Sequence, residues 1–146
     1  MNSLPSLARR VAVVTGASRG IGKGIATVLG EQGATVYVTA RTTAATPNAT
    51  SGTISSGTIN EVAEAITAGG GAGIAVRCDH ADDEQIKALF EQVRADILVN
   101  GATAIRPDPL APPPPFWNKS IAIADQVTVG YRVIQLGPCP VLAVDV

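Results

Sequence analysis

Residues 11–22 have the sequence VAVVTGASRGIG, which indicates the fold class of the protein. Residues 11–14 form a continuous apolar run, which is typical of a buried strand in a parallel sheet. A glycine-rich turn follows, and residues 35–39, TVYVT, have the β-branched and aromatic composition of a second strand. The residues between predict an amphipathic helix that ends near Gly33. Its apolar stripe would be Ile21, Ile25, Val28 and Leu29.

The same alternation continues along the chain. Thr58 and Glu61 have capping-box spacing, which predicts a helix that ends near residues 69–71. Residues 73–78 and 96–99 are strand candidates, and acids at 82–84 suit the start of a helix between them. That helix would bury Ile86, Leu89, Phe90 and Val93. Alternating strands and helices predict an α/β fold, with a parallel sheet covered by helices on both faces.

Composition excludes several classes of protein. With 46% apolar and 16% charged residues, the chain has enough apolar side chains for a core. A net charge of −1 argues against a nucleic-acid partner, and no apolar run is long enough to cross a membrane. Cys78 and Cys139 do not have the spacing of a metal site with His80, so we expect no metal and two reduced thiols in a cytoplasmic protein.

The turn at residues 15–22 carries the chemistry. Glycines let the backbone approach a pyrophosphate closely, and the free amides at the start of a helix bind its oxygens. A strand before the turn, a helix after it and a second strand at the right distance give the context that a dinucleotide site requires. The alternative is a turn that packs the helix on the strand and binds no ligand.

This turn, TGASRGIG, resembles the Gly-x-x-x-Gly-x-Gly turn of the short-chain dehydrogenases/reductases. The resemblance continues at residues 78–80, Cys-Asp-His, where family members carry an Asp beside the adenine ring. Residues 98–102 match the family's Asn-Asn-Ala-Gly segment in part, with Gly101 in place of the second Asn. Residues 107–117, with the Pro-rich stretch and Phe-Trp, resemble one subset of the family. The resemblance implies that the following residues bind the cofactor: Gly16, Ser18, Arg19, Gly20, Ile21, Gly22, Arg41, Asp79, His80, Asn100, Gly101 and Ala102.

The resemblance also implies the architecture. We expect a Rossmann-type doubly wound parallel sheet that is incomplete, with about four strands and flanking helices. Residues 1–134 would form the amino-terminal part of an NAD(P)-binding domain, and residues 135–146 would be a divergent, poorly specified tail. The edge of the strand at 96–99 would then be open, and such an edge favours homo-oligomers.

The end of the second strand bears on the choice of cofactor. An NAD site places an acid there to accept a hydrogen bond from the ribose 2′-hydroxyl. This chain has Arg41 instead, which could pair with a 2′-phosphate, and Arg19 could add a second contact. The sequence therefore predicts NADP(H) in preference to NAD(H). The alternative is that Arg41 is a solvated surface charge.

The family transfers a hydride between the cofactor and a carbonyl or alcohol, using a Ser and a Tyr-x-x-x-Lys pair. In this chain the residue four positions after Tyr37 is Arg41, and the residue four positions after Tyr131 is Gln135. The Tyr-x-x-x-Lys pair is therefore absent from these 146 residues. Thr128 stands where the family has an Asn. We therefore assign no catalytic residue and expect a truncated, inactive chain. Two alternatives stay open, a non-catalytic NADP(H)-binding module or oligomer partner and a decayed fragment.

Two further predictions concern the later part of the chain. Residues 107–115 hold six prolines in nine positions, which fits an extended loop beside the active site or a docking peptide. Residues 116–134 have apolar side chains at helical spacing and predict a final helix. The substrate is not predicted from these residues.

Overall fold

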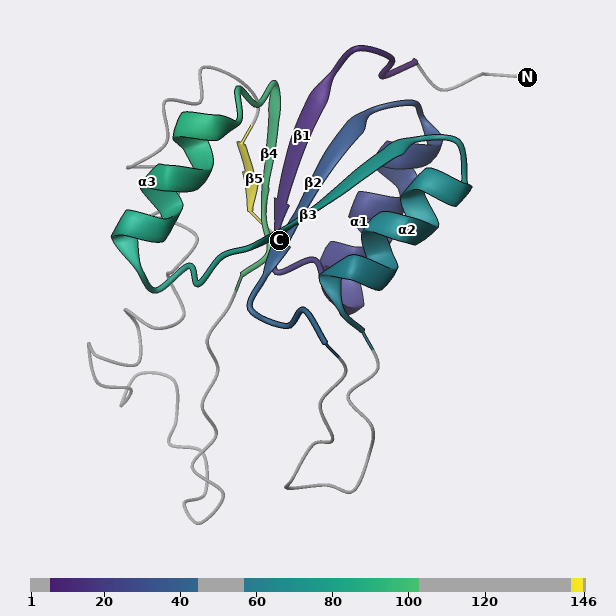
Figure 1. The fold of residues 1–146 in the computed structure, drawn as a ribbon. Helices are drawn as coiled ribbons and strands as arrows, with labels where there is room; N and C mark the ends of the chain where they lie inside the picture. Colours follow the sequence, from purple (N-terminus) through teal and green to yellow (C-terminus); the bar gives the residue numbers. More distant parts are fainter. Residues whose placement is uncertain (1–5, 45–56, 103–142, 146) are drawn as a thin grey trace, which may run out of the picture.

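The computed structural model describes residues 6–44, 57–102 and 143–145 (Figure 1). These residues form one sheet in the order β3-β2-β1-β4-β5, in which every paired strand is parallel. The α/β fold expected from the alternating pattern is confirmed. The elements in chain order are β1 Val11–Thr15, α1 Gly20–Glu31, β2 Thr35–Ala40, α2 Ile59–Ala68, β3 Ala72–Arg77, α3 Asp83–Gln92, β4 Ile97–Asn100 and β5 Ala143–Asp145.

Helices cover both faces of the sheet. Figure 1 shows α1 and α2 on one side of the strands and α3 on the other. Strand β1 alternates between the two layers, because Ala12 and Val14 pack with α1 and α2 whereas Val13 packs with α3. Residues 11–14 are therefore apolar throughout, as a strand buried on both faces must be. The α3 layer buries Ile86, Leu89, Phe90 and Val93, as predicted.

The predicted starts of two helices are confirmed in atomic detail. At α2, the Thr58 hydroxyl accepts a hydrogen bond from the Glu61 amide at 3.1 Å, and the Glu61 carboxylate accepts one from the Thr58 amide at 3.0 Å. At α3, the Asp82 carboxylate accepts hydrogen bonds from the amides of Glu84 and Gln85. Both caps use amide groups that a helix start leaves without a partner inside the helix.

The apolar stripe predicted for α1 is wrong in part. Ile21 is 71% exposed and Val28 is 50% exposed, while the buried side of the helix carries Gly22, Ala26 and Gly30. Small residues lie there because the contact is close. A Cβ on Gly30 would lie 2.4 Å from a methyl carbon of Ile66 in α2.

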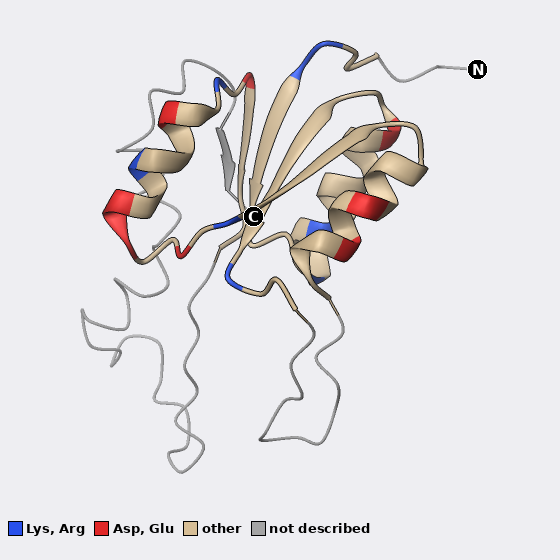
Figure 2. Cartoon of the chain, viewed as in Figure 1, with Lys and Arg blue, Asp and Glu red and all other residues tan. Residues whose placement is uncertain are grey.

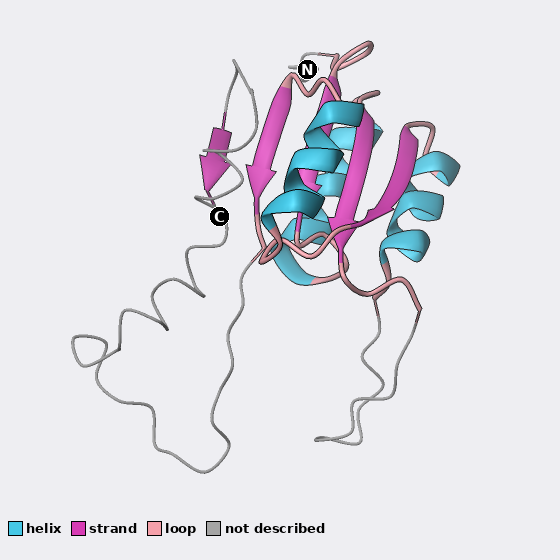
Figure 3. Cartoon of the chain, turned by 60° about the vertical axis from the view of Figure 1, so that its left-hand side comes forward, coloured by secondary structure: helices cyan, strands magenta, loops and turns pink. Residues whose placement is uncertain are grey.

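The expected open edge on the fourth strand is also wrong. Residues Ala143–Asp145 form β5, which pairs in parallel with Leu98–Asn100 of β4. Figure 3 shows β5 beyond β4 at the end of the sheet. The physical reason is that, without β5, the amide and carbonyl groups on the outer edge of β4 would lack partners. Residues Ala143–Asp145 supply those partners. The predicted Pro-rich loop at 107–115 and helix at 116–134 lie outside the described residues.

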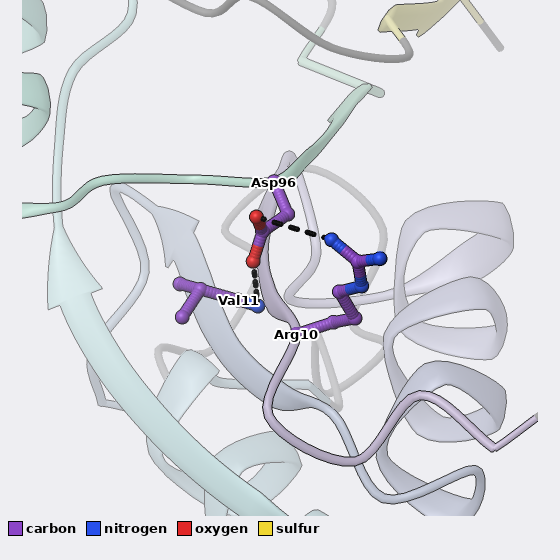
Figure 4. Close-up of polar contacts among 3 residues, drawn as sticks. All are labelled: Arg10, Val11 and Asp96. Atoms are coloured by element: carbon purple, nitrogen blue, oxygen red, sulfur yellow. Dashed lines mark hydrogen bonds and ion pairs between the residues drawn. The ribbon is translucent and has the colours of Figure 1, made fainter.

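One carboxylate joins the beginnings of β1 and β4 (Figure 4). The Val11 amide donates a hydrogen bond to Asp96 Oδ2 at 2.9 Å, and the Asp96 amide donates one to the Val11 carbonyl at 2.8 Å. The Arg10 guanidinium lies 3.6 Å from Asp96 Oδ1. Asp96 therefore aligns the two central strands at the end of the sheet opposite the glycine turn.

Candidate functional site

The glycine turn lies between the end of β1 and the start of α1, at the carboxyl edge of the sheet. Gly16 has a φ of +66°, and a Cβ built on it would lie 2.3 Å from the Gly101 carbonyl oxygen at the end of β4. A Cβ on Gly22 would lie 2.6 Å from the Gly16 carbonyl oxygen. Only glycine fits at these positions, because backbone groups occupy the space of a side chain.

Gly20 is a different case. Its φ is +58°, yet a Cβ built there would have no atom of the described residues within 4 Å. This position faces open space at the start of α1, where Ile21 is also exposed. Helix α1 has no side-chain cap and no acid in its first turn, unlike α2 and α3. An uncapped helix start next to open space suits an anionic group, so this turn fits the pyrophosphate of a dinucleotide.

One buried hydroxyl and one backbone hydrogen bond hold the ends of three strands together at this edge. The Thr15 hydroxyl accepts hydrogen bonds from the amides of Gly101 and Ala102, each at 3.1 Å. The Ala17 amide donates to the Thr39 carbonyl at 3.2 Å. The turn is thereby fixed to the ends of β4 and β2. Ser18 and Asn100 are buried beside it, at 5% and 4% exposure.

The two arginines expected at the cofactor are both exposed at this edge. Arg19 is the residue before α1, and Arg41 comes directly after β2. Strands β1 and β2 are neighbours in register, with Thr15 opposite Thr39, so the segments that follow them leave the sheet side by side. On the right-hand side of Figure 2 the acidic residues lie on the helices, and a basic residue directly follows β2.

At the end of β3, Asp79 and His80 differ in exposure. Asp79 is half-buried, and its carboxylate accepts a hydrogen bond from the Ala81 amide at 3.0 Å. His80 is only 4% exposed, and burial lowers its pKa to about 4, against a smaller opposing effect of Asp79. Its ring lies against Thr39 and Cys78 rather than solvent. Burial, assisted by Asp79 and Asp82, also raises the pKa of Cys78 to about 11.

The structure therefore brings the predicted site residues of β1, α1, β2 and β4 to one edge of the sheet, with Asp79 and His80 following β3. Sequence reasoning missed Thr15, Thr39 and Gly57. A Cβ on Gly57 would lie 2.3 Å from the Ser18 carbonyl oxygen, so the segment before α2 also contacts the turn. The available signal for the threonines was a polar residue at the end of each apolar strand. Nothing in the Ser/Thr/Gly-rich stretch at 42–60 singled out Gly57.

Tyr37, within β2, is partly buried and packs against the core layer of α3. Among the residues that the structure describes, no group of three or more His, Cys, Asp or Glu side chains could hold a metal ion. Within the same ranges, every helix is too short or too polar to cross a membrane.

Comparison with known proteins finds relatives that match most of this chain. Residues 10–124 match the family described as short chain dehydrogenase. Dehydrogenase/reductase SDR family member 1 of Mus musculus is 37% identical over 131 residues, which cover 84% of this chain and 38% of that protein. An uncharacterized oxidoreductase of Methylorubrum extorquens is 39% identical over 104 residues, covering 68% of this chain and 37% of that protein.

Solved structures agree. A putative dehydrogenase from Xanthomonas campestris superposes with a TM-score of 0.71 at 30% identity, covering 91% of this chain and 49% of the other. A metagenomic short-chain oxidoreductase in complex with NADP gives a TM-score of 0.64 at 30% identity, covering 89% and 55%. The chain spans well under two thirds of each relative.

Proposed function

Because the chain belongs to the short-chain dehydrogenase/reductase family, we propose that its glycine-turn edge binds NADP(H) in preference to NAD(H). The observation that carries the proposal is the open position at Gly20, beside the uncapped start of α1. The pyrophosphate would lie on the amides of this helix start, where the helix dipole favours negative charge. Ile21 is exposed at the same place and would contact the cofactor.

The preference for the phosphorylated cofactor is supported by charge. Arg41 directly follows β2 and Arg19 directly precedes α1, and both are exposed; residues 39–44 contain no acid that could accept from a ribose 2′-hydroxyl. A guanidinium pairs well with a 2′-phosphate. A structural relative is also described with NADP bound.

The remaining predicted residues would complete the cofactor site. Asp79, at the end of β3, would lie on the adenine side. Asn100 ends β4 and residues 101 and 102 follow it against the turn, and these three residues would line the side of the nicotinamide ribose. When bound, the cofactor supplies the hydride that this family exchanges with a carbonyl or alcohol.

We further propose that these 146 residues bind the cofactor without turnover. A tyrosine with its usual pKa near 10 is a poor acid or base at neutral pH unless a nearby cation lowers its pKa. No Tyr-x-x-x-Lys pair is present in this sequence, and Tyr37 is partly buried against the core layer of α3. The chain would then act as a dinucleotide-binding module.

A thermal melt of the chain with NADPH or NADH tests the site. Ligand at about 100 times its dissociation constant adds about 2.7 kcal/mol to the stability, so NADPH should raise the Tm more than NADH at equal concentration. Arg41→Asp should remove or reverse this preference. Arg94→Asp is the matched control, because it makes the same change of charge in the connection between α3 and β4, at the opposite end of the sheet.

Each outcome of the melt decides one part of the proposal. Equal stabilisation by both cofactors, unchanged in Arg41→Asp, would refute the preference for NADP(H). No stabilisation of a cooperatively folded chain by either cofactor would refute the binding site itself. Oxidation of NADPH by the pure chain with any carbonyl substrate would contradict the absence of turnover.

A cytoplasmic location belongs to the same proposal. It is supported by Cys78, a free thiol that is fully buried, as expected of a protein from a reducing compartment. Fractionation of expressing cells checks it, and recovery of the chain outside the cytoplasm would contradict it.

A further inference from the structure

A chain of buried polar groups runs beneath the carboxyl ends of β3, β2 and β1. Cys78 Sγ lies 3.7 Å from His80 Nδ1, and His80 Nε2 lies 2.8 Å from Thr39 Oγ1. The Thr39 hydroxyl in turn donates to the Val14 carbonyl oxygen at 3.5 Å. Each of the four residues is at most 4% exposed, so water does not compete for these contacts.

The direction of the hydrogen bonds follows from the inventory of protons. The Val14 carbonyl can only accept, so the single hydroxyl proton of Thr39 points toward it. Thr39 Oγ1 must then accept from the ring, which places a proton on His80 Nε2. In the neutral ring Nδ1 is left as an acceptor, and the Cys78 thiol donates to it. The neutral tautomer with its proton on Nε2 is the one in which all three contacts are hydrogen bonds at once. The pKa values agree, since burial keeps the ring neutral and the thiol protonated at pH 7.

The backbone groups of Thr39 and Cys78 also hydrogen-bond to segments that belong to the candidate site. The Thr39 carbonyl accepts from the Ala17 amide of the glycine turn, and Arg41 comes two residues after Thr39. The Cys78 amide donates to the Ala40 carbonyl at 3.1 Å, which joins the ends of β3 and β2. Asp79 stands between Cys78 and His80. The position of the ring therefore bears on all three segments.

We propose that His80 is a positioning residue, which holds the ends of β2 and β3 together through Thr39 and Cys78 so that Arg41 and Asp79 face the adenosine side of the cofactor. His80 thus acts through its neighbours and does not itself touch the ligand. The effect on cofactor binding rests on the proposed function, whereas the tautomer of His80 and its effect on the strand ends do not.

Nitrogen NMR on the chain labelled with ¹⁵N-histidine tests the tautomer without any ligand. His80 is the sole histidine in the sequence, so its two ring signals need no assignment by mutation. At pH 7 we expect a protonated Nε2 and an unprotonated Nδ1. A proton on Nδ1, or rapid exchange between the two tautomers, would overturn the proposed direction of the hydrogen bonds.

The Thr39→Val variant tests the positioning role, because it removes the hydroxyl and keeps the β-branched shape. We expect the ring to lose its single tautomer, and hydrogen exchange at the Ala17 and Cys78 amides to speed up about tenfold, the effect of one lost net hydrogen bond. Thr27→Val is the matched control, since the Thr27 hydroxyl donates to the Lys23 carbonyl within α1. Unchanged exchange at both amides in Thr39→Val would refute the positioning role.

Binding then separates this proposal from the proposed function. Thr39→Val should weaken NADPH binding several-fold, while Thr27→Val should leave it unchanged. His80→Leu should also lose affinity, and His80→Gln, whose amide can donate to Thr39, should keep most of it. Equal affinities in all five proteins would refute the link to the cofactor. If the unmodified chain binds neither NADPH nor NADH, the proposed function fails, and the NMR and exchange results still decide the role of His80.

Discussion

The buried histidine predicts that the free energy of unfolding falls as the pH is lowered from 7 to 5. Burial lowers the pKa of His80 to about 4, against 6.5 in an unfolded chain. As the pH drops through 6.5, the unfolded chain takes up a proton that the folded chain does not accept until the pH approaches 4. Protonation therefore favours the unfolded state in this window, and the stability is fully present only above pH 6.5.

The magnitude follows from the separation of the two pKa values. Each unit of separation corresponds to about 1.36 kcal/mol, so the loss between pH 7 and pH 5 is about 2 kcal/mol and approaches about 3 kcal/mol near pH 4. His80 is almost fully buried, so solvent screening does not reduce this value much. For a domain whose total stability is about 5–15 kcal/mol, the effect is large.

Urea unfolding of the chain at pH 5, 6 and 7 measures this loss. The His80→Gln variant cannot titrate in this range, so its free energy of unfolding should vary less with pH by about 2 kcal/mol. Lys87→Gln, which removes an exposed charge from α3 and keeps the histidine, should behave like the unmodified chain. An identical fall in stability between pH 7 and pH 5 with and without the histidine would refute the reasoning.

Three further predictions concern local stability and can be checked by urea unfolding at pH 7. Gly16→Ala should lower the free energy of unfolding by at least about 2 kcal/mol, because Gly16 has a positive φ and lies against backbone atoms. Gly24→Ala should raise it by up to about 1 kcal/mol, because Gly24 lies inside α1 with no atom of the described residues near its Cβ position. Thr58→Ala should cost about 1 kcal/mol, because α2 loses its capping hydroxyl. Asp96→Ala should cost about 1–3 kcal/mol through the lost partner of a strand amide, while Arg10→Ala, whose side chain is 61% exposed, should cost less than about 1 kcal/mol. Similar costs for the last two variants would contradict that assignment.

The elements from β1 to β4 could be predicted because short-range chemistry determines them. The apolar run before the glycine turn, the Thr58 capping box and the acids before α3 each act within a few residues. The order of elements then follows from the β-α-β rule for parallel strands. Most of the candidate site was predictable for the same reason, since a turn that follows a strand must lie at the carboxyl edge of the sheet.

Contacts between distant residues could not be predicted in this way. The pairing of β5 with β4 depends on the edge that the other strands leave, and its short sequence carries no register signal. The exposure of Ile21 and Val28 depends on how closely α2 approaches α1. The burial of His80 depends on Thr39, 41 residues earlier, and could not be seen from its place after Asp79.

The contact between Val11 and Asp96 has a consequence for the way the chain acquires its structure. Strand β1 pairs with β2 soon after in the sequence, but its pairing with β4 must wait for residues 85 positions further on. While the chain is being synthesised, β1, β2 and β3 can assemble with α1 and α2 on one face before α3 covers the other. Val13, Tyr37 and Val76 then stay exposed on a growing chain. We expect this interval to be the slow and aggregation-prone stage of folding, and the stage at which a chaperone would bind.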